Sequence, residues 1–259
     1  MTYYDQHLHT HHSFDCQESF ENYLALSPGQ LVTTEHLDLC NPAEDFADSM
    51  PDYDAYTAEI AELEAKHTIR ILKGIEIGFV KEHWPAIASY LAGKDFDVQL
   101  LSVHQNGKYD YMDDVVLTLD PQELIADYYT RMLSAVETAD SCNILTHFDY
   151  GVRRLSLTPE AFQSYAEPYL IPLFKAVIEK QLAFELNAKS FITYGNRLLY
   201  NYAVPLYRSL GGKLFTLGSD AHRAADYELA FDDMSEFLKG FGVSHLATYQ
   251  KGKLQLVAM

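Results

Sequence analysis

Short apolar runs that end in histidine, aspartate or glutamate recur along this sequence, and they constrain its fold more than any other feature. The first of them is Asp5-Gln6-His7-Leu8-His9. Side chains two positions apart in a β-strand point to the same side, so Asp5, His7 and His9 would converge on one point. Imidazole and carboxylate groups are ligands for zinc, manganese and iron. Taken alone, this segment could also be the polar end of a solvated strand.

Five later runs end in the same way. They lead into Glu35-His36, Glu76, His104, His147 and Ser219-Asp220-Ala221-His222. Six such coincidences in one chain are hard to explain as solvated surface. They favour one shared site to which all six strand ends contribute.

Strands and helices are expected to alternate along the chain. We predict strands near residues 2–9, 31–36, 69–77, 98–104, 143–148, 182–188 and 213–219. The spacing of apolar residues predicts helices at 51–67, 121–139, 158–181, 196–210 and 226–241, with N-caps at Asp52 and Thr158 and breaks at Pro168 and Pro172. This alternation indicates an α/β fold with parallel strands. Six converging strand ends favour a closed, irregular βα barrel over an open sheet, whose strand ends lie along a line.

Composition limits the class of protein. The chain has 259 residues, 48% of them hydrophobic, which suits a sizeable core, and no linker or repeat divides residues 1–259, so we expect one domain. The net charge of -18 opposes nucleic acid or an anionic membrane as the main partner. The three cysteines show no C-x-x-C spacing and are expected to be free thiols. The chain shows neither a signal-peptide pattern nor an apolar run of about 20 residues, so we expect a cytoplasmic enzyme of undetermined oligomeric state.

The motifs and their order resemble the polymerase-and-histidinol-phosphatase (PHP) family. The matching residues are Asp5-x-His7-x-His9, Thr34-Glu35-His36, Gly74-Ile75-Glu76, Ser102-Val103-His104, Thr146-His147 and Ser219-Asp220-Ala221-His222, which together span nearly the whole chain. The resemblance implies a distorted, TIM-barrel-like (β/α)7 barrel that binds two or three divalent metal ions (Zn, Mn or Fe). Chain length, the Thr-Glu-His variant and the Gly-Ser-Asp-Ala-His ending look most similar to the stand-alone histidinol-phosphatase type.

The resemblance also implies which residues hold the metals. The ligands of a first metal would be His7, His9 and Asp220. The ligands of a second would be His104 and His147, with Glu76 bridging the two metals. The ligands of a third would be Asp15, His36 and His222. Many relatives have a histidine where Asp15 stands, so the metal preference of the third site is expected to differ. Asp5 would orient His7 or His9.

Hydrolysis of a phosphate monoester is the reaction that suits this ligand set best, because divalent cations activate water and neutralise phosphoryl oxygens. Glu76, Asp220 and His222 are the candidate catalytic residues. Asp220, His222 or a supporting histidine could protonate the leaving group, and the sequence does not choose among them. The family type implies L-histidinol phosphate as the small-molecule substrate and a role in histidine biosynthesis.

Basic residues on the loops after the fifth and sixth strands are candidates for phosphate binding, because the arginine fork fits two phosphate oxygens. They are Arg153, Arg154, Lys189 and Arg197. Ordinary surface ion pairs are the alternative for each arginine. Asp113, Asp114 and Asp149 are candidate partners for the amino and imidazole groups of the substrate, and His11 and His12 either line the mouth of the site or are polar loop residues.

Two other functions stay open at this point. The chain could be a PHP phosphoesterase acting on a nucleotide, a sugar phosphate or a phosphotyrosyl protein. It could also be an inactive PHP module that binds metal or protein. The complete ligand set argues against the second alternative, because inactive modules lose ligands.

Overall fold

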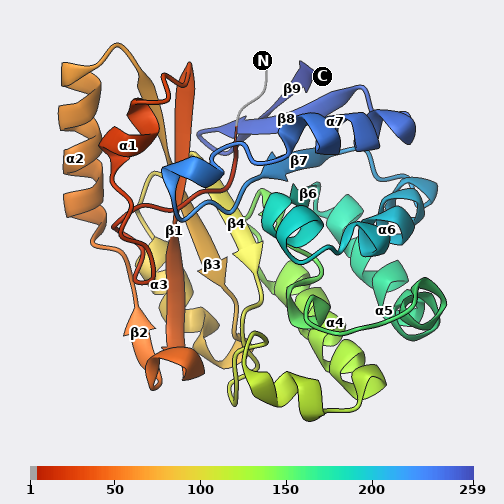
Figure 1. The fold of residues 1–259 in the computed structure, drawn as a ribbon. Coiled ribbons are helices and arrows are strands. Elements are labelled where there is room, and N and C mark those ends of the chain that lie inside the picture. Colours follow the sequence, from red (N-terminus) through yellow and green to blue (C-terminus); the bar gives the residue numbers. More distant parts are fainter. Residues whose placement is uncertain (1–4) are drawn as a thin grey trace.

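A seven-stranded sheet forms the centre of the computed structural model, which describes residues 5–259 (Figure 1). Its strand order is β2-β1-β3-β4-β5-β6-β7. The strands are β1 (Gln30–Asn41), β2 (Ala47–Ser49), β3 (Arg70–Gly78), β4 (Val98–Ser102), β5 (Ile144–Leu145), β6 (Ala183–Asn187) and β7 (Phe215–Gly218). All neighbouring pairs are parallel except β1 and β2, which are antiparallel. The predicted α/β class and the strand alternation are confirmed.

The N-terminal segment closes this sheet into a barrel. The Gln6 N–H donates to the carbonyl of Leu217 in β7 at 3.2 Å. On the other side, the Thr34 N–H in β1 donates to the carbonyl of Leu8 at 2.8 Å. The segment therefore fills the place of the strand predicted at 2–9, between β7 and β1; residues 2–4 of that prediction lie outside the described residues.

Helices surround the sheet, with α2 on one side and α4, α5 and α6 on the other (Figure 1). They are α1 (Phe20–Leu24), α2 (Tyr53–Lys66), α3 (Trp84–Leu91), α4 (Pro121–Thr138), α5 (Pro159–Glu179), α6 (Arg197–Ser209) and α7 (Phe231–Gly240). Short 3-10 turns lie at Pro42–Glu44, Lys81–His83, Asp114–Thr118, Tyr150–Val152 and Ala224–Asp226, and a π-helical turn at Lys189–Thr193. Side chains packed between these helices and the sheet form the main hydrophobic core.

The predicted N-caps are confirmed, whereas the predicted breaks in α5 are wrong. Asp52 accepts the Ala55 N–H at the start of α2, and Thr158 caps α5 in the same way. Helix α5 continues through Pro168 and Pro172, which are both exposed. Each proline removes one helical hydrogen bond on the solvent side, which destabilises the helix locally. The opposite face of α5 stays packed against the core, and this packing outweighs the lost hydrogen bonds.

A C-terminal hairpin, which the strand prediction did not include, covers the amino end of the barrel. Strands β8 (His245–Gln250) and β9 (Lys253–Ala258) pair in antiparallel register. Ala247 and Tyr249 of β8 pack against barrel residues Val32, Leu72, Val98, Leu100, Ile144 and Ala183. Apolar side chains thus fill the amino end of the barrel, and the carboxyl end of the strands stays accessible to ligands.

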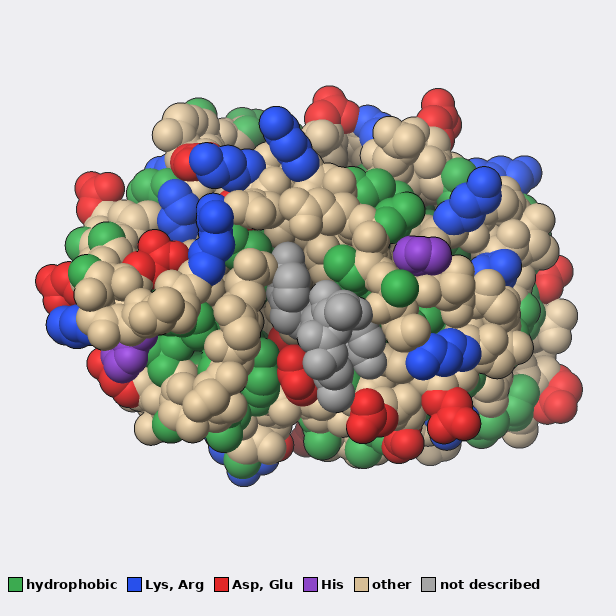
Figure 2. Space-filling model, turned by 90° about the horizontal axis from the view of Figure 1, so that it is seen from above, with side chains coloured by type: hydrophobic (Ala, Val, Ile, Leu, Met, Phe, Trp, Pro, Cys, Tyr) green, Lys and Arg blue, Asp and Glu red, His purple; other side chains and the backbone are tan. Residues whose placement is uncertain are grey.

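The surface seen from above Figure 1 is mixed in charge. Lys and Arg side chains lie between Asp and Glu side chains over the described part of this face (Figure 2). The excess of negative charge is therefore not gathered there. Among residues 5–259, no helix combines the length and the apolar character that a membrane span requires.

Removing the Phe184 ring should test the packing that supports the barrel. Phe184 in β6 is fully buried, and its ring lies 5.2 Å from the rings of Phe148 and Phe174. We expect Phe184→Ala to lower the free energy of unfolding by about 3–5 kcal/mol, because it leaves a cavity. Denaturant unfolding measures this. Phe46→Ala is the matched control, because the Phe46 side chain is 57% exposed. It should change the free energy of unfolding by no more than about 0.5 kcal/mol. Equal effects of the two substitutions would contradict the role of Phe184 in the core.

Candidate metal centre

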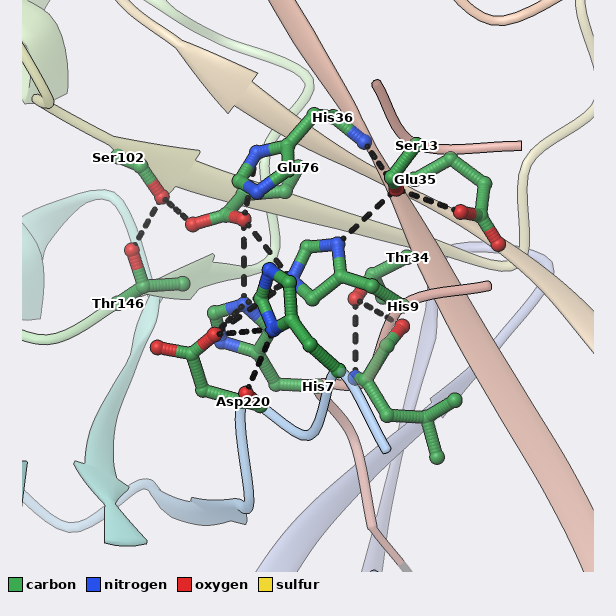
Figure 3. A network of polar contacts seen from close by, with 12 residues as sticks. His7, His9, Ser13, Thr34, Glu35, His36, Glu76, Ser102, Thr146 and Asp220 are labelled. Atoms are coloured by element: carbon green, nitrogen blue, oxygen red, sulfur yellow. Dashed lines mark hydrogen bonds and ion pairs between the residues drawn. The ribbon is translucent and has the colours of Figure 1, made fainter. Parts of the chain in front are cut away.

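Histidine and acidic side chains from distant parts of the chain meet at the carboxyl end of the barrel (Figure 3). They are His7, His9, Asp15, His36, Glu76, His104, His147, Asp220 and His222. The structure thus brings together all nine residues for which the sequence predicts metal binding. Most of them are buried, and all except His7 and His9 line a cleft with a volume of about 130 Å³.

Glu76, at the carboxyl end of β3, lies at the centre of this cluster. Its Oε1 is 3.1 Å from His104 Nε2 and 2.8 Å from His147 Nε2. Its Oε2 is 3.2 Å from His7 Nε2 and 3.3 Å from His9 Nε2. Each carboxylate oxygen therefore faces a different set of imidazole nitrogens, as a carboxylate that bridges two cations would.

Asp220 completes the group around His7 and His9. Its Oδ1 is 3.6 Å from His9 Nε2 and 3.9 Å from His7 Nε2. The residue follows β7 and has a φ of 55°, in the left-handed region that non-glycine residues rarely adopt. Its N–H donates to the His7 carbonyl at 2.8 Å, and this bond holds the unusual backbone in place.

A third group lies nearer the surface. Oδ2 of Asp15 is 3.1 Å from His222 Nε2 and 3.5 Å from His36 Nε2. His36 Nδ1 is in turn 3.2 Å from Glu76 Oε2, so this group adjoins the first. Asp15 comes from the exposed turn before α1, and an aspartate here still offers an oxygen ligand.

The hydrogen-bond network assigns the ring protons of His7 and His9 to Nδ1. His7 Nδ1 lies 2.7 Å from Glu185 Oε1, which can only accept. Ser13 Oγ donates its proton to Glu35 Oε2 at 2.6 Å, so it accepts from His9 Nδ1 at 3.2 Å. The two Nε2 atoms, 3.2 Å apart, then direct their lone pairs at each other and at a carboxylate. Lone pairs gathered in this way repel one another unless a cation lies between them.

Hydrogen-bond acceptors near Nδ1 orient three further imidazoles. Asp38 Oδ1 lies 2.9 Å from His104 Nδ1. The Asp220 carbonyl lies 3.0 Å from His222 Nδ1. Thr146 Oγ1 lies 3.4 Å from His147 Nδ1. An acceptor on Nδ1 leaves Nε2 free as a ligand and sets the direction of the ring.

The electrostatics of the cluster favour positive charge at its centre. Burial opposes protonation of His7 and His36, but the Glu76 carboxylate raises the pKa of both well above the usual range. Burial would raise the pKa of Glu76, yet the nearby imidazoles hold it well below its usual value. Glu76 Oε2 is buried and has no hydrogen-bond partner among the described residues. Divalent cations would supply the missing charge and ligand contacts, so the residues fit metal ions.

Several supporting residues were missed by the sequence reasoning. Glu185 and Asp38 were not singled out, although an acidic residue inside a buried apolar strand, as in Phe184-Glu185-Leu186, is a usable signal. Glu35, which directly precedes the predicted ligand His36, is fully buried and accepts the Ser13 hydroxyl.

Asp5 supports the site in a different way from the one expected. Its Oδ1 accepts the backbone N–H groups of His7 and Ser219, at 3.1 and 2.9 Å. Asp5 therefore ties the N-terminal segment to the end of β7 and does not contact the imidazole rings.

Two of the four predicted phosphate-binding residues lie at the cleft. Lys189 Nζ is 3.2 Å from Asp220 Oδ1. Arg153 is 4% exposed and lines the cleft, with its guanidinium 4.7 Å from the Tyr150 ring and 5.1 Å from the Tyr194 ring. Its Nε and Nη2 have no hydrogen-bond partner among the described residues. A buried guanidinium with free donors can bind an anion.

The other two arginines lie away from the cleft. Arg154 donates to the Met112 carbonyl and pairs with Asp114 Oδ1 at 2.7 Å. Arg197 is exposed and lies over the rings of Phe191 and Phe237, at 5.3 and 5.4 Å. Their loops do reach the carboxyl end of the barrel, but local partners draw both side chains outward.

The acidic residues suggested as partners for the substrate also lie elsewhere. Asp113 Oδ2 accepts the Asp110 N–H, and Asp114 pairs with Arg154. Asp149 is buried beneath the cleft, where it accepts from Asn196 Nδ2 at 3.0 Å. Asp110 lines the cleft instead, and it was not singled out from the sequence.

Comparisons with known proteins connect this cluster to one family. The sequence profile of the PHP domain matches residues 5–189. A histidinol-phosphatase of Lactococcus lactis subsp. lactis (strain IL1403) is 28% identical over 260 residues, which cover 96% of this chain and 95% of that protein. The match thus extends beyond residue 189 and includes Asp220 and His222.

Two solved structures share the fold. One is histidinol phosphate phosphatase from Lactococcus lactis subsp. lactis IL1403, complexed with zinc, L-histidinol and phosphate. It is 26% identical, covers 97% of this chain and 98% of its own, and has a TM-score of 0.85. The other, from Listeria monocytogenes, is 14% identical, covers 88% of this chain and 98% of its own, and has a TM-score of 0.70, which bears on the fold alone.

The role of Glu185 in orienting the centre can be tested by Glu185→Gln. Its two oxygens accept from His7 Nδ1 at 2.7 Å and from the His147 N–H at 2.8 Å. Glutamine has one acceptor oxygen, so one donor loses its partner. We expect metal affinity to fall about 10- to 100-fold, as for other supporting residues of metal sites. Competition with a chromophoric chelator measures this.

Glu62→Gln is the control for this experiment, because Glu62 is 72% exposed and its one ion pair among residues 5–259 is with Lys66. Its metal affinity should equal that of the unchanged protein. If Glu185→Gln also binds metal with unchanged affinity, the carboxylate does not position His7.

Proposed function

We propose that this chain, which belongs to the PHP domain family, is a metal-dependent phosphomonoesterase that hydrolyses L-histidinol phosphate to L-histidinol and phosphate. The observation that carries the proposal is the Glu76 carboxylate, whose two oxygens face two different sets of imidazole nitrogens. The full-length similarity to a histidinol-phosphatase supports the substrate, as does the related structure with L-histidinol and phosphate bound. The expected setting is histidine biosynthesis in the cytoplasm, without nucleic acid or membrane.

The nine clustered residues would hold two or three divalent ions of the zinc, manganese or iron type. His7, His9 and Asp220 would hold one ion, His104 and His147 a second, and Asp15, His36 and His222 a third, with Glu76 between the first two. Bound cations of this kind lower the pKa of water from about 16 to roughly 7 and neutralise charge on phosphoryl oxygens. Zinc in the related structure makes zinc the first candidate.

Arg153 and Lys189 would bind the phosphoryl group. Arg153 has two buried nitrogen atoms without partners, and the rings of Tyr150 and Tyr194 hold its guanidinium in place. A planar fork of this kind can donate to two phosphate oxygens at once. Lys189 brings a second positive charge to the same cleft. Because the guanidinium is already fixed by packing, little entropy is lost when the anion binds.

The leaving group would lie near Asp110. This carboxyl is 5% exposed and accepts from the Tyr150 hydroxyl at 3.0 Å and from the Met112 N–H at 2.8 Å. Its position in the cleft suits a cationic amino or imidazole group of the substrate. Asp220 and His222 lie beside Lys189 and are the candidate groups for holding the proton that the leaving oxygen needs.

Phosphate release tests the proposed activity. With its metal bound, the enzyme should cleave L-histidinol phosphate with a kcat/KM at least about 100-fold above that for p-nitrophenyl phosphate, because a site built around specific polar contacts discriminates strongly. Removal of metal should abolish turnover, and added zinc or manganese should restore it. Glu76→Gln and His104→Asn should be inactive with an unchanged circular dichroism spectrum.

Two outcomes of this assay would count against the proposal. Similar low rates on every monoester would reject the substrate and leave the enzyme class in place. Turnover that does not respond to metal would reject the class itself.

The assignment of Arg153 can be tested against a matched arginine. Arg153→Ala should raise the KM for L-histidinol phosphate about 10- to 100-fold, since a hydrogen bond to a charged group contributes about 1.5–3 kcal/mol. Arg197→Ala should leave KM unchanged, because that side chain lies outside the cleft. Steady-state kinetics on both variants measures the two KM values. Equal KM values for the two would remove Arg153 from the substrate site.

A further inference from the structure

A second set of metal-type ligands lies outside the nine-residue cluster. His11 and His12 stand on the turn that follows His9, and Glu59 faces them from α2. Oε2 of Glu59 is 3.1 Å from His11 Nε2 and 2.7 Å from His12 Nε2. The three ligand atoms all lie within 4.8 Å of one another. None of these residues belongs to the site described above.

Aromatic packing holds both imidazoles in place. The His12 ring lies 5.3 Å from the Tyr56 ring in an edge-on arrangement. Phe20 packs edge-on against both histidines, at 6.2 Å from His11 and 6.1 Å from His12. The rings are therefore aimed at Glu59 by their surroundings, and an ion that binds there would have few side-chain rotations left to freeze.

The surroundings of these histidines also favour a cation. A cavity of about 370 Å³ adjoins them, and Asp48 is among its lining residues. The described residues that line this cavity include no lysine or arginine. Water from the cavity could take the remaining coordination position of an ion held by the three ligands.

The chemistry of the donor set points to one class of ion. Two imidazoles and one carboxylate are a recurrent ligand set of zinc sites that keep one position open for water. Magnesium and calcium prefer oxygen ligands throughout and suit this set poorly. We propose that His11, His12 and Glu59 form an accessory site for a transition-metal ion of the zinc class, separate from the nine-residue centre.

The accessory site would act on the segment that also carries catalytic ligands. His11 and His12 lie between His9 and Asp15, which both belong to the nine-residue cluster. A metal bound to Glu59 would tie this segment to α2. The expected consequence is a more rigid turn around Ser13 and Asp15, on the side of the cluster where the third group of ligands lies nearest the surface.

Hydrogen bonds alone are the competing explanation for this geometry. Two protonated imidazole nitrogens could share one carboxylate oxygen at the observed distances. The two explanations differ in the number of metal ions that the protein binds, and this number can be measured without any turnover. Failure of the proposed enzyme activity would therefore leave the test intact.

The number of bound metal ions distinguishes an accessory metal site from hydrogen bonds alone. The full-length protein is stripped with a chelator and titrated with Zn²⁺ against a chromophoric competitor. The unchanged protein should bind one equivalent more than Glu59→Gln, whose affinity at this site should fall at least about 100-fold, because loss of a supporting residue alone costs 10- to 100-fold. Glu62→Gln, from the exposed side of the same helix, should bind the same number as the unchanged protein.

His11→Asn provides a second variant at a more exposed position. It should lose the same equivalent, and in both variants the remaining equivalents should bind with unchanged affinity. An unchanged count in both variants would overturn the proposal. Weakened binding of all equivalents would also overturn it, because the ion would then belong to the nine-residue centre.

Discussion

Glu76 places a negative charge in the interior of the barrel, and five imidazoles surround it. A carboxylate taken out of water costs several kcal/mol unless opposite charge or hydrogen bonds compensate it. Here the compensation comes from residues on four different segments, so the charge cannot be satisfied until the barrel has closed. The rest of the site depends on this requirement. It also explains why bound cations would stabilise the folded chain, since they bind the assembled cluster better than the unfolded chain.

A second layer of acceptors decides what the inner residues can do. Glu185, Asp38 and the pair formed by Ser13 and Glu35 each accept from, or support the acceptor of, an imidazole Nδ1. That choice of proton position leaves Nε2 of His7, His9 and His104 free as a ligand. The two ends of the barrel therefore differ. Apolar side chains and the C-terminal hairpin fill one end, and the ligands with their acceptors occupy the other.

Much of this arrangement could be predicted from the sequence, because it follows local rules. An apolar run that ends in His36 or His104 reads as a strand that carries a polar residue at its carboxyl end, and parallel strands bring such ends together. Asp52 and Thr158 were recognisable as caps. The hairpin β8–β9 was missed, although Lys251-Gly252 between two alternating runs is a turn signal. Arg197 was misplaced because its position in the chain says where its loop begins and not which ring its side chain contacts.

The sequence by itself determined the alternation of strands and helices, the family and the identities of the nine clustered residues, because these follow from side-chain type and spacing along the chain. Only the tertiary structure decided which oxygen of Glu76 faces which imidazoles, that Glu185 and Asp38 support them, and that Arg153 rather than Arg197 lines the cleft. Each of these depends on distances of a few ångströms between residues far apart in the chain. Such distances are set by the closure and packing of the whole barrel, which no local pattern records.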